Sequence, residues 1–313
     1  MPVYAYFKKQ FVPMAEAKIG IMTNSFHYGT GVFEGIRGNW NNEEKELYLF
    51  RLKEHYERML NGCRILKIKL PYSIDELCEL TVELIGKCEF KEDIYVRPIA
   101  YKSSEALGVR LHGLEDDFSV FAFPWGAYLD VEKARCGVSS WRRHKDMPQA
   151  KLSGPYIISA LAKTEAIENG FDEAIMLTQD GVVSEGSGEN IFLVKNGKLI
   201  TPAPFNSILV GITRDSAIKL AQNELGIETT ERSIDRSELY TADECFLTGT
   251  AANITPVGEI DHRKVGNGEV GEVTKKLQNL YLDATKGKKP KYLEWCTPVY
   301  RKNLVSESKT RKR

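Results

Sequence analysis

The stretch that decides the fold reads Ala174-Ile-Met-Leu-Thr-Gln-Asp-Gly-Val-Val-Ser-Glu-Gly-Ser-Gly-Glu-Asn-Ile-Phe-Leu-Val-Lys-Asn-Gly197. Its apolar runs at residues 174–178, 182–184 and 190–194 are typical of strands, and turn residues separate them. The Asn196-Gly197 pair favours a two-residue hairpin turn after the last run. Three strands so close together predict a sheet in this part of the chain.

Helix signals surround this sheet. Residues 156–168 predict a helix that ends at Asn169-Gly170, and Gly211-Ile-Thr-Arg214 opens another helix that stops at Gly226. Two further elements are expected, a strand at 244–247 and a helix at 270–284. The second half of the chain is therefore predicted to be a mixed, sheet-rich domain.

The first half of the chain combines strands with two amphipathic helices. Residues 47–50 predict a strand, and the apolar spacing over 52–66 predicts a helix. Ser73 followed by Glu76 is a capping box that opens a second helix. Two more strand-like runs lie at 94–101 and 118–125. This mixture predicts a compact α+β domain.

The predicted organisation follows from length and from one interruption. A chain of 313 residues is long enough for two domains that each bury a core. Pro and Gly interrupt the strand pattern in Phe123-Pro-Trp-Gly-Ala-Tyr-Leu-Asp-Val131, which indicates an interdomain connection. We predict a small α+β domain (1–121), an interdomain loop (122–131), a larger sheet-rich α/β domain (132–296) and a basic C-terminal tail (297–313).

Composition excludes several classes of protein. The 43 Lys and Arg balance 43 Asp and Glu, and 42% of residues are hydrophobic, which excludes a disordered, collagen-like or coiled-coil chain. The balanced charge gives no support for nucleic-acid binding. The six cysteines form no CxxC pair, and no histidine has metal-ligand spacing, so no metal site is expected. Without a signal peptide or an apolar window of roughly 18 residues, we expect a cytoplasmic protein with no membrane partner.

Lys151 is a candidate for covalent chemistry. It lies among small residues just before a predicted helix, where a cofactor could approach the backbone. A Schiff-base lysine needs a confined site in which its amine loses a proton, although most lysines are solvated surface charges. Tyr156 could bond a phenolic oxygen nearby, and Glu185 could meet a protonated ring nitrogen. The Ser184–Asn190 loop fits a plain turn equally well.

Two segments suit a phosphate group. Gly211-Ile-Thr-Arg214 lies at a helix start, where backbone N–H groups and the helix dipole favour an anion. Thr248-Gly-Thr-Ala-Ala-Asn253 follows a strand and could supply backbone amides and a hydroxyl. By itself, Thr213 is more commonly a helix cap.

Eight motifs occur along the chain: Phe26-His-Tyr-Gly-Thr30, Val32-Phe-Glu-Gly-Ile-Arg37, Tyr95-Val-Arg-Pro98, Phe123-Pro-Trp-Gly-Ala-Tyr-Leu129, Ala150-Lys151, Ser184-Glu-Gly-Ser-Gly-Glu-Asn190, Gly211-Ile-Thr-Arg214 and Gly249-Thr-Ala-Ala252. In this order they resemble branched-chain amino acid aminotransferases, which are pyridoxal-phosphate enzymes of fold type IV. The resemblance covers nearly the whole chain. It implies reversible, ping-pong transfer of an amino group between L-leucine, L-isoleucine or L-valine and 2-oxoglutarate, with pyridoxal 5'-phosphate (PLP) as the cofactor.

The resemblance also implies roles toward the cofactor. Lys151 would bind PLP as a Schiff base and carry the proton between Cα and C4′. Glu185 would keep the pyridine nitrogen protonated, which makes the ring an electron sink. Tyr156 would bond the ring O3′. The phosphate would be bound by Arg58, the amides of Ile212 and Thr213, and Thr250. The cofactor would then lie at the domain junction.

Substrate residues follow from the same resemblance. The apolar part of the pocket would be lined by Phe33, Trp125 and Tyr156. The α-carboxylate would be bound by Tyr95 and the amides of Thr250 and Ala251. The distal carboxylate of glutamate would be bound by Arg97, Tyr128 and Tyr28. Tyr28 would come from a neighbouring subunit, which implies a homodimer or a higher homo-oligomer.

Alternative functions within the same fold are a D-amino-acid aminotransferase and an aminodeoxychorismate lyase. A non-catalytic relative that keeps only the fold is a third. The sequence departs from the common family pattern at Leu152-Ser-Gly-Pro155 and at Val210. Because Pro155 has no backbone N–H, we expect the helix start after Lys151 to be slightly reshaped.

Overall fold

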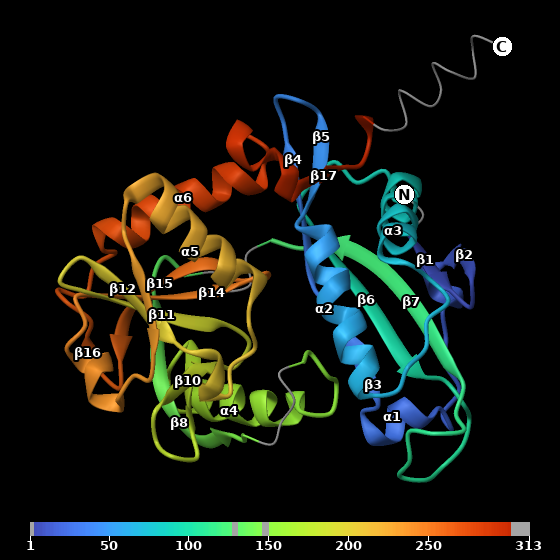
Figure 1. Ribbon diagram of the computed structural model, residues 1–313, viewed down its shortest axis with the longest axis horizontal. Coiled ribbons are helices and arrows are strands. Elements are labelled where there is room, and N and C mark those ends of the chain that lie inside the picture. Colours follow the sequence, from blue (N-terminus) through green and yellow to red (C-terminus); the bar gives the residue numbers. More distant parts are fainter. Residues whose placement is uncertain (1–2, 127–130, 146–149, 302–313) are drawn as a thin grey trace. The chain divides into compact units, whose positions relative to one another are not determined.

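The computed structural model describes residues 3–126, 131–145 and 150–301. The chain divides into two compact units, and each is built on one large sheet (Figure 1). Unit 1 comprises Met1–Gly126, Ala150–Gly154 and Asp283–Arg313, and unit 2 comprises Ala127–Gln149 and Pro155–Leu282. No helix among the described residues is long and apolar enough to cross a membrane.

Unit 1 contains an eight-stranded antiparallel sheet. Its strand order is β17-β5-β4-β6-β7-β1-β2, and β3 pairs with β6 beside this path. The elements are β1 (Tyr4–Phe7), β2 (Gln10–Pro13), η1 (Met14–Glu16), α1 (Asn24–Tyr28), β3 (Gly31–Phe33), β4 (Ile36–Asn41), β5 (Glu46–Phe50), α2 (Leu52–Ile65), α3 (Ile74–Cys88), β6 (Ile94–Lys102), β7 (Asp116–Pro124), η4 (Pro290–Trp295) and β17 (Cys296–Pro298).

The core of unit 1 lies between this sheet and the helices α2 and α3. Tyr56 and Met59 on α2 are fully buried and belong to one apolar cluster with strand residues such as Leu49. The N–H of Glu76 donates to Ser73 Oγ at 3.2 Å, and the N–H of Ser73 donates to the Glu76 carboxylate at 2.7 Å. These reciprocal bonds confirm the capping box, and α3 begins directly after it.

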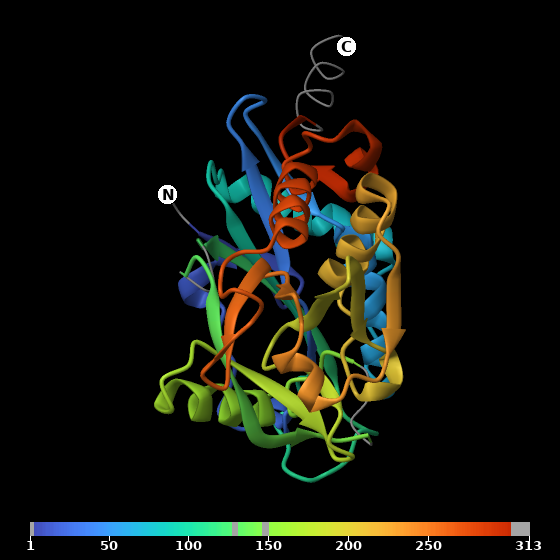
Figure 2. The ribbon, with the colours of Figure 1, turned by 90° about the vertical axis from the view of Figure 1, so that its left-hand side faces the viewer.

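A buried carboxylate fastens the C-terminal segment to the sheet of unit 1. Glu46 is fully buried at the start of β5. Its carboxylate accepts hydrogen bonds from the backbone N–H groups of Val299, Tyr300 and Arg301 at 3.0, 2.8 and 2.8 Å. Figures 1 and 2 show this last described part of the chain, in red, beside the β4–β5 hairpin, where β17 pairs with β5.

Unit 2 contains a nine-stranded mixed sheet. Its order is β10-β9-β8-β15-β14-β11-β12-β13, with β16 paired to β15. The pairs β8–β9, β8–β15 and β12–β13 are parallel. The elements are β8 (Ala134–Arg143), α4 (Tyr156–Glu168), β9 (Glu173–Thr178), β10 (Val183–Gly186), β11 (Asn190–Lys195), β12 (Lys198–Pro202), η2 (Pro204–Asn206), α5 (Ile212–Leu225), β13 (Thr229–Arg232), η3 (Arg236–Tyr240), β14 (Glu244–Gly249), β15 (Asn253–Ile260), β16 (Arg263–Lys264) and α6 (Glu272–Thr285).

Local signals explain several of these elements. Asn196 and Gly197 adopt positive φ angles of 51° and 72° and form the two-residue turn between β11 and β12. Gly226 ends α5 with a left-handed φ of 65°. Helix α4 packs on β9, because Ala162 and Met176 share a small apolar cluster.

The two units differ from the predicted domain ranges. The prediction assigns residues 150–154 to the larger domain, whereas they belong to unit 1. They run along β3, and the N–H of Ser153 donates to Gly31 O at 2.9 Å. The first boundary falls at Gly126 instead of residue 121.

The end of the larger domain also differs from the prediction. The prediction places it at residue 296, but the chain enters unit 1 for the last time at Asp283. The reason is the antiparallel pairing of β17 with β5, in which Cys296 faces Phe50. A three-residue strand leaves a weak signal in the sequence, so sequence reasoning did not find this pairing.

Candidate functional site

Lys151 lies on a short extended segment that the backbone of β3 holds. The N–H of Phe33 donates to Lys151 O at 3.0 Å, and an antiparallel bridge joins Val32 to Leu152. Lys151 Nζ lies 5.1 Å from the centroid of the Phe33 ring. The side chain is half-buried beside an aromatic face, which is the confined setting that a covalently acting lysine requires.

Arg58, on α2, is held by a buried carboxylate. Its Nε and Nη2 donate to the two oxygens of Glu34, both at 2.7 Å, and His55 Nδ1 lies 2.8 Å from the same carboxylate. Burial opposes ionisation of Glu34, but the charge and hydrogen bonds of Arg58 outweigh it and hold the pKa of Glu34 well below its usual range. Burial lowers the pKa of His55, so the imidazole is neutral at pH 7. Arg58 is therefore a cation in a fixed orientation.

Four predicted substrate residues of unit 1 form one cluster. The guanidinium carbon of Arg97 lies 4.7 Å from the ring centroid of Phe33 and 5.2 Å from that of Tyr95. Arg97 Nη2 donates to Tyr95 Oη at 3.2 Å. The Tyr95 ring meets Trp125 edge to face at 4.6 Å. A cation is thus placed among aromatic rings, which stabilise it.

Gly35 provides the space that Tyr95 occupies. A Cβ atom at Gly35 would lie 1.8 Å from Tyr95 Oη. The Tyr95 ring is 5% exposed and packs on Trp125, so it has little room to turn away. Gly35 lies within the Val32–Arg37 motif, and the sequence alone predicts no role for it.

Tyr28 ends helix α1 and is 38% exposed. Its hydroxyl accepts a hydrogen bond from the N–H of Gly108 at 3.0 Å, in the connection between β6 and β7. In the role expected for Tyr28, this exposed ring would serve the site of a neighbouring subunit. Tyr128, the other tyrosine expected at the distal carboxylate, lies outside the described residues.

In unit 2, Glu185 lies on β10 and is 6% exposed. Asn190 Nδ2 and the backbone N–H of Leu209 donate to its Oε2 at 3.1 and 2.9 Å. Arg143 Nε lies 3.2 Å from its Oε1, a charge pair without the alignment of a hydrogen bond. Donors and a neighbouring cation favour the ionised carboxylate. Glu185 can therefore meet a protonated ring nitrogen.

Ile212 and Thr213 are the first two residues of α5, and Gly211 is its N-cap. A Cβ atom at Gly211 would lie 2.1 Å from Asn190 Oδ1, so the helix start approaches β11 more closely than a side chain would allow. Thr213 is not the cap, and its Oγ1 lies 3.4 Å from Tyr281 Oη. The amides at this helix start and the helix dipole suit an anion.

The remaining predicted residues of unit 2 lie at two element junctions. Thr250 and Ala251 are half-buried in the tight turn between β14 and β15. Tyr156 is the first residue of α4, directly after Pro155. The expected reshaping of this helix start is small, because Pro155 has helical dihedral angles (φ −60°, ψ −20°) and the N–H it lacks would have no partner in the helix.

Sequence reasoning missed the residues that support the predicted ones. These are Glu34, His55, Arg143 and Asn190. Two of them, Glu34 and Asn190, lie within the quoted motifs, and that position was the available signal. The contacts of the other two become visible only in the folded chain.

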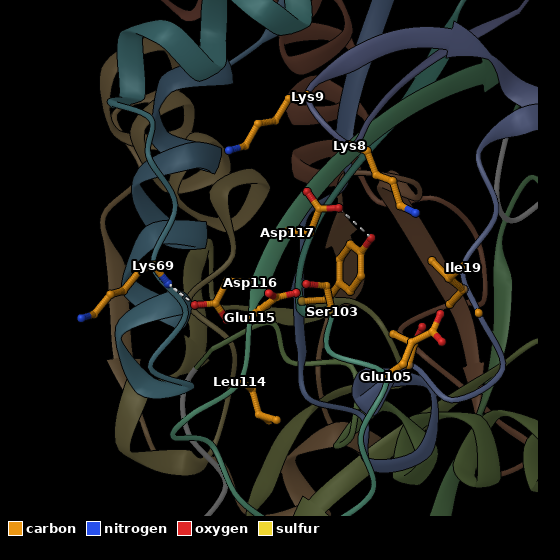
Figure 3. Close-up of a pocket in the computed structure, with 13 residues that line it drawn as sticks. Lys8, Lys9, Ile19, Lys69, Ser103, Glu105, Leu114, Glu115, Asp116 and Asp117 are labelled. Atoms are coloured by element: carbon orange, nitrogen blue, oxygen red, sulfur yellow. Dashed lines mark hydrogen bonds between the residues drawn. The ribbon is translucent and has the colours of Figure 1, made fainter.

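Figure 3 shows a polar cavity of unit 1 that contains none of the predicted site residues. Its volume is about 820 Å³. The Tyr101 hydroxyl donates to Asp117 at 3.2 Å, and the N–H of Lys69 donates to Asp116 at 2.9 Å. Within residues 3–126, 131–145 and 150–301, no group of three His, Cys, Asp or Glu side chains could hold a metal ion.

Comparisons with known proteins place the chain in a family. Residues 31–260 match the family model of class IV aminotransferases. The chain is 54% identical to the probable branched-chain-amino-acid aminotransferase of Aquifex aeolicus, over 96% of this chain and 97% of that protein. Among solved structures, the branched-chain aminotransferase of Thermoproteus uzoniensis with norvaline is 46% identical, with a TM-score of 0.92 over 96% of this chain and 100% of that one.

A second solved structure includes a derivative of the cofactor. The T.th. branched-chain amino acid aminotransferase complexed with N-(5'-phosphopyridoxyl)-L-glutamate is 42% identical, with a TM-score of 0.89 over 95% of this chain and 98% of that one. The predicted fold type IV architecture and the family resemblance of the motifs are confirmed. The chain belongs to the class IV aminotransferase family.

Proposed function

We propose that this protein is a branched-chain-amino-acid aminotransferase that exchanges amino groups between L-leucine, L-isoleucine or L-valine and 2-oxoglutarate. The names of its relatives support this activity. The observation that carries the proposal is the packing of Arg97 against Phe33 and Tyr95. Aromatic walls suit an aliphatic side chain, and the guanidinium suits the second carboxylate of glutamate, so one pocket serves both half-reactions.

The protein uses PLP, and the described residues fit this cofactor. Lys151 is a half-buried amine, and Glu185 is a carboxylate with little exposure whose neighbouring donors and cation favour its charged form. Arg58 and the start of α5 are positive partners suited to a phosphate. When bound, PLP supplies a ring that takes up the electron pair left on the substrate when Cα loses its proton.

We infer one task for each of these side chains. Lys151 Nζ takes the proton from substrate Cα and delivers it to C4′. Glu185 holds the proton on the pyridine nitrogen, because its own charge is kept by Arg143 and Asn190. Tyr156 donates to the ring O3′. The phosphate is bound by Arg58, the amides of Ile212 and Thr213, and the hydroxyl of Thr250.

The substrate is oriented by a second set of residues. We propose that Tyr95 and the amides of Thr250 and Ala251 bind the α-carboxylate, which fixes Cα above the ring. The aliphatic side chain packs against Phe33, Trp125 and Tyr156, which exclude water. The distal carboxylate of glutamate is bound by Arg97, Tyr128 and Tyr28.

We also propose that the protein forms a homo-oligomer and works in the cytoplasm. The exposed Tyr28 ring supports a homodimer or a higher homo-oligomer in which it serves a neighbouring site. All six cysteines are free thiols, and five of them are buried, which supports the cytoplasm as the compartment.

Two experiments test the proposal. Turnover of L-leucine, L-isoleucine or L-valine with 2-oxoglutarate is expected, and turnover of D-amino acids or of aminodeoxychorismate instead would transfer the assignment to the alternatives. Borohydride reduction should attach the cofactor to the peptide that contains Lys151. Lys151→Ala should lose both the label and the activity, while Lys198→Ala, an exposed control, keeps them. A colourless protein without a label would support a non-catalytic relative.

A further inference from the structure

A buried carboxylate in the same loop as Glu185 has no role in the chemistry proposed above. Glu189 is 5% exposed. Two glycines pack against it, since a Cβ atom at Gly186 would lie 2.8 Å from Glu189 Oε2 and one at Gly249 would lie 3.3 Å from Glu189 Cγ. Gly186 in this loop and Gly249 at the end of β14 therefore make room for the Glu189 side chain.

Three carboxylates and two cations lie together in this part of unit 2. Glu185 pairs with Arg143 at 3.2 Å, and Glu173 pairs with Lys163 at 2.6 Å. Glu185, Glu173 and Glu189 are all buried. If all three were ionised, the group would hold one negative charge without compensation, which is costly in a protein interior.

The hydrogen bonds indicate that Glu189, rather than Glu173, carries a proton. Glu173 accepts from Lys163 Nζ at 2.6 Å and from the N–H of Ala174 at 2.7 Å. Glu189 accepts from the N–H of Gly188 at 3.1 Å, a longer bond from a neutral donor. Burial, together with repulsion by Glu173, raises the pKa of Glu189 to about 8, although the charge of Lys163 opposes the shift.

We propose that Glu189 is a positioning residue that stays protonated in the folded protein and leaves Glu185 as the ionised carboxylate of the loop. The consequence for catalysis rests on the proposed function. With Glu189 protonated, the single negative charge of Glu185 meets the ring nitrogen, and Glu189 does not compete for Arg143. The titratable groups that face Glu189 are Lys163 from α4, Cys136 from β8, Glu173 from β9 and Glu185 from β10. Burial raises the pKa of Cys136, so its thiol adds no charge.

The pH dependence of stability tests this proposal, with Glu189→Gln and wild type compared in the PLP-loaded form. Glutamine has the shape of a protonated glutamate and does not ionise. Glu189 ionises at its ordinary pKa of 4.5 in the unfolded chain and near 8 in the folded one. The folded state thus holds one more proton in this window, and stability is lost as pH rises through it.

The expected result is a difference in stability between wild type and Glu189→Gln that grows with pH. Relative to Glu189→Gln, the folding equilibrium constant of wild type should fall by up to about tenfold per pH unit from about pH 5 to about pH 8, and then level off. Urea unfolding at several pH values measures it. A difference that is constant over this range, or that has the opposite slope, overturns the proposal.

Glu165→Gln is the matched control in the same unit. Hydrogen bonds from Ser139 and Ser140 outweigh the effect of burial and lower the pKa of Glu165. Glu165 is therefore ionised in both states above about pH 5, and its variant should differ from wild type by the same amount throughout. The contrast between the two variants separates a protonated carboxyl from any general loss of packing.

An infrared measurement covers the case in which Glu189→Gln does not fold. Wild type at pH 7 should show the C=O stretching band of a protonated carboxyl, and the band should disappear as pH rises beyond about 8. Its absence at pH 7 overturns the proposal. Neither measurement depends on transamination, so an incorrect substrate assignment would leave both results unchanged.

Discussion

Replacing Arg143 by methionine should destabilise unit 2 and weaken its binding of PLP. Arg143 pairs with Glu185 at 3.2 Å, and its Nη2 donates to Ser159 Oγ at 3.0 Å and to Ser187 O at 3.1 Å. Methionine fills similar space without a charge or a donor. The substitution therefore takes the neighbouring cation away from the Glu185 carboxylate.

The size of the stability loss in Arg143→Met follows from the burial of the Arg143–Glu185 pair. The side chains of Arg143 and Glu185 are 15% and 8% exposed, so water screens their attraction poorly. Removing one partner of such a pair costs about 3–5 kcal/mol of unfolding free energy, because the other charge stays buried. The pKa of Glu185 should rise when the cation is lost. In the role proposed for Glu185, a less ionised carboxylate would hold the ring proton less well, and we expect at least about a tenfold loss of PLP affinity, or roughly 1.4 kcal/mol.

Two measurements and two variants test this reasoning. Urea unfolding gives stability, and titration of the apo-protein with PLP, followed by visible absorbance, gives affinity. The control is Arg135→Met on the same strand, since Arg135 pairs with Asp172 at 2.9 Å but is 54% exposed and should tolerate the change. Arg143→Lys should fall between wild type and Arg143→Met, because lysine restores the charge but not the forked geometry. Equal losses in Arg143→Met and Arg135→Met would refute the argument.

Three other predictions concern unit 1. Glu46→Gln should lower the free energy of unfolding by about 2–4 kcal/mol, because the amide nitrogen that replaces one carboxyl oxygen cannot accept from a backbone N–H. Hydrogen exchange should then speed up in the C-terminal segment, and unchanged exchange would contradict this. Gly35→Ala should displace Tyr95 and lower kcat/KM for L-leucine by roughly 10- to 100-fold with PLP still bound, as absorbance can check. Glu34 has a lowered pKa through Arg58, so its contribution to stability is present above its ordinary pKa of 4.5 and is lost as pH falls below that value. Acid unfolding of Glu34→Gln should be less steep than that of wild type.

Elements with strong local signals were predictable from the sequence, and several inner strands, among them β8 and β15, were not. Helix α4 covers the predicted 156–168, because Asn169-Gly170 marks its end. Strand β8 is rich in Arg and Ser, and a register shift after Val138 breaks its alternation. Strand β15 contains Pro256, which local rules exclude from a central strand. The pairing of β15 with β8 begins only at Val257, so the missing N–H of the proline leaves that ladder intact.

The candidate site residues stay predictions, and the sequence indicates them through motifs and through the family resemblance. Lys151 and Glu185 lie in motifs, but the contacts that fix the neighbouring charges could not be predicted from the sequence. Arg58 and Glu34 are 24 residues apart, on a helix and in the connection between β3 and β4. Arg143 reaches Glu185 from another strand of the sheet. Such pairs depend on how strands and helices pack, and no local spacing in the sequence encodes that packing.

The path of the chain through the two units limits how the protein can be divided. The chain leaves unit 1 after Gly126, returns for Ala150–Gly154 alone, and enters it for the last time at Asp283. A fragment of residues 127–282 would carry the Lys151 segment without the β3 backbone that holds it. A fragment of residues 1–126 would lack β17, which pairs with β5, and the residues after it that Glu46 binds. Neither contiguous fragment therefore contains both the Lys151 segment and the β3 backbone that holds it, so cutting the chain at these boundaries separates residues that depend on each other.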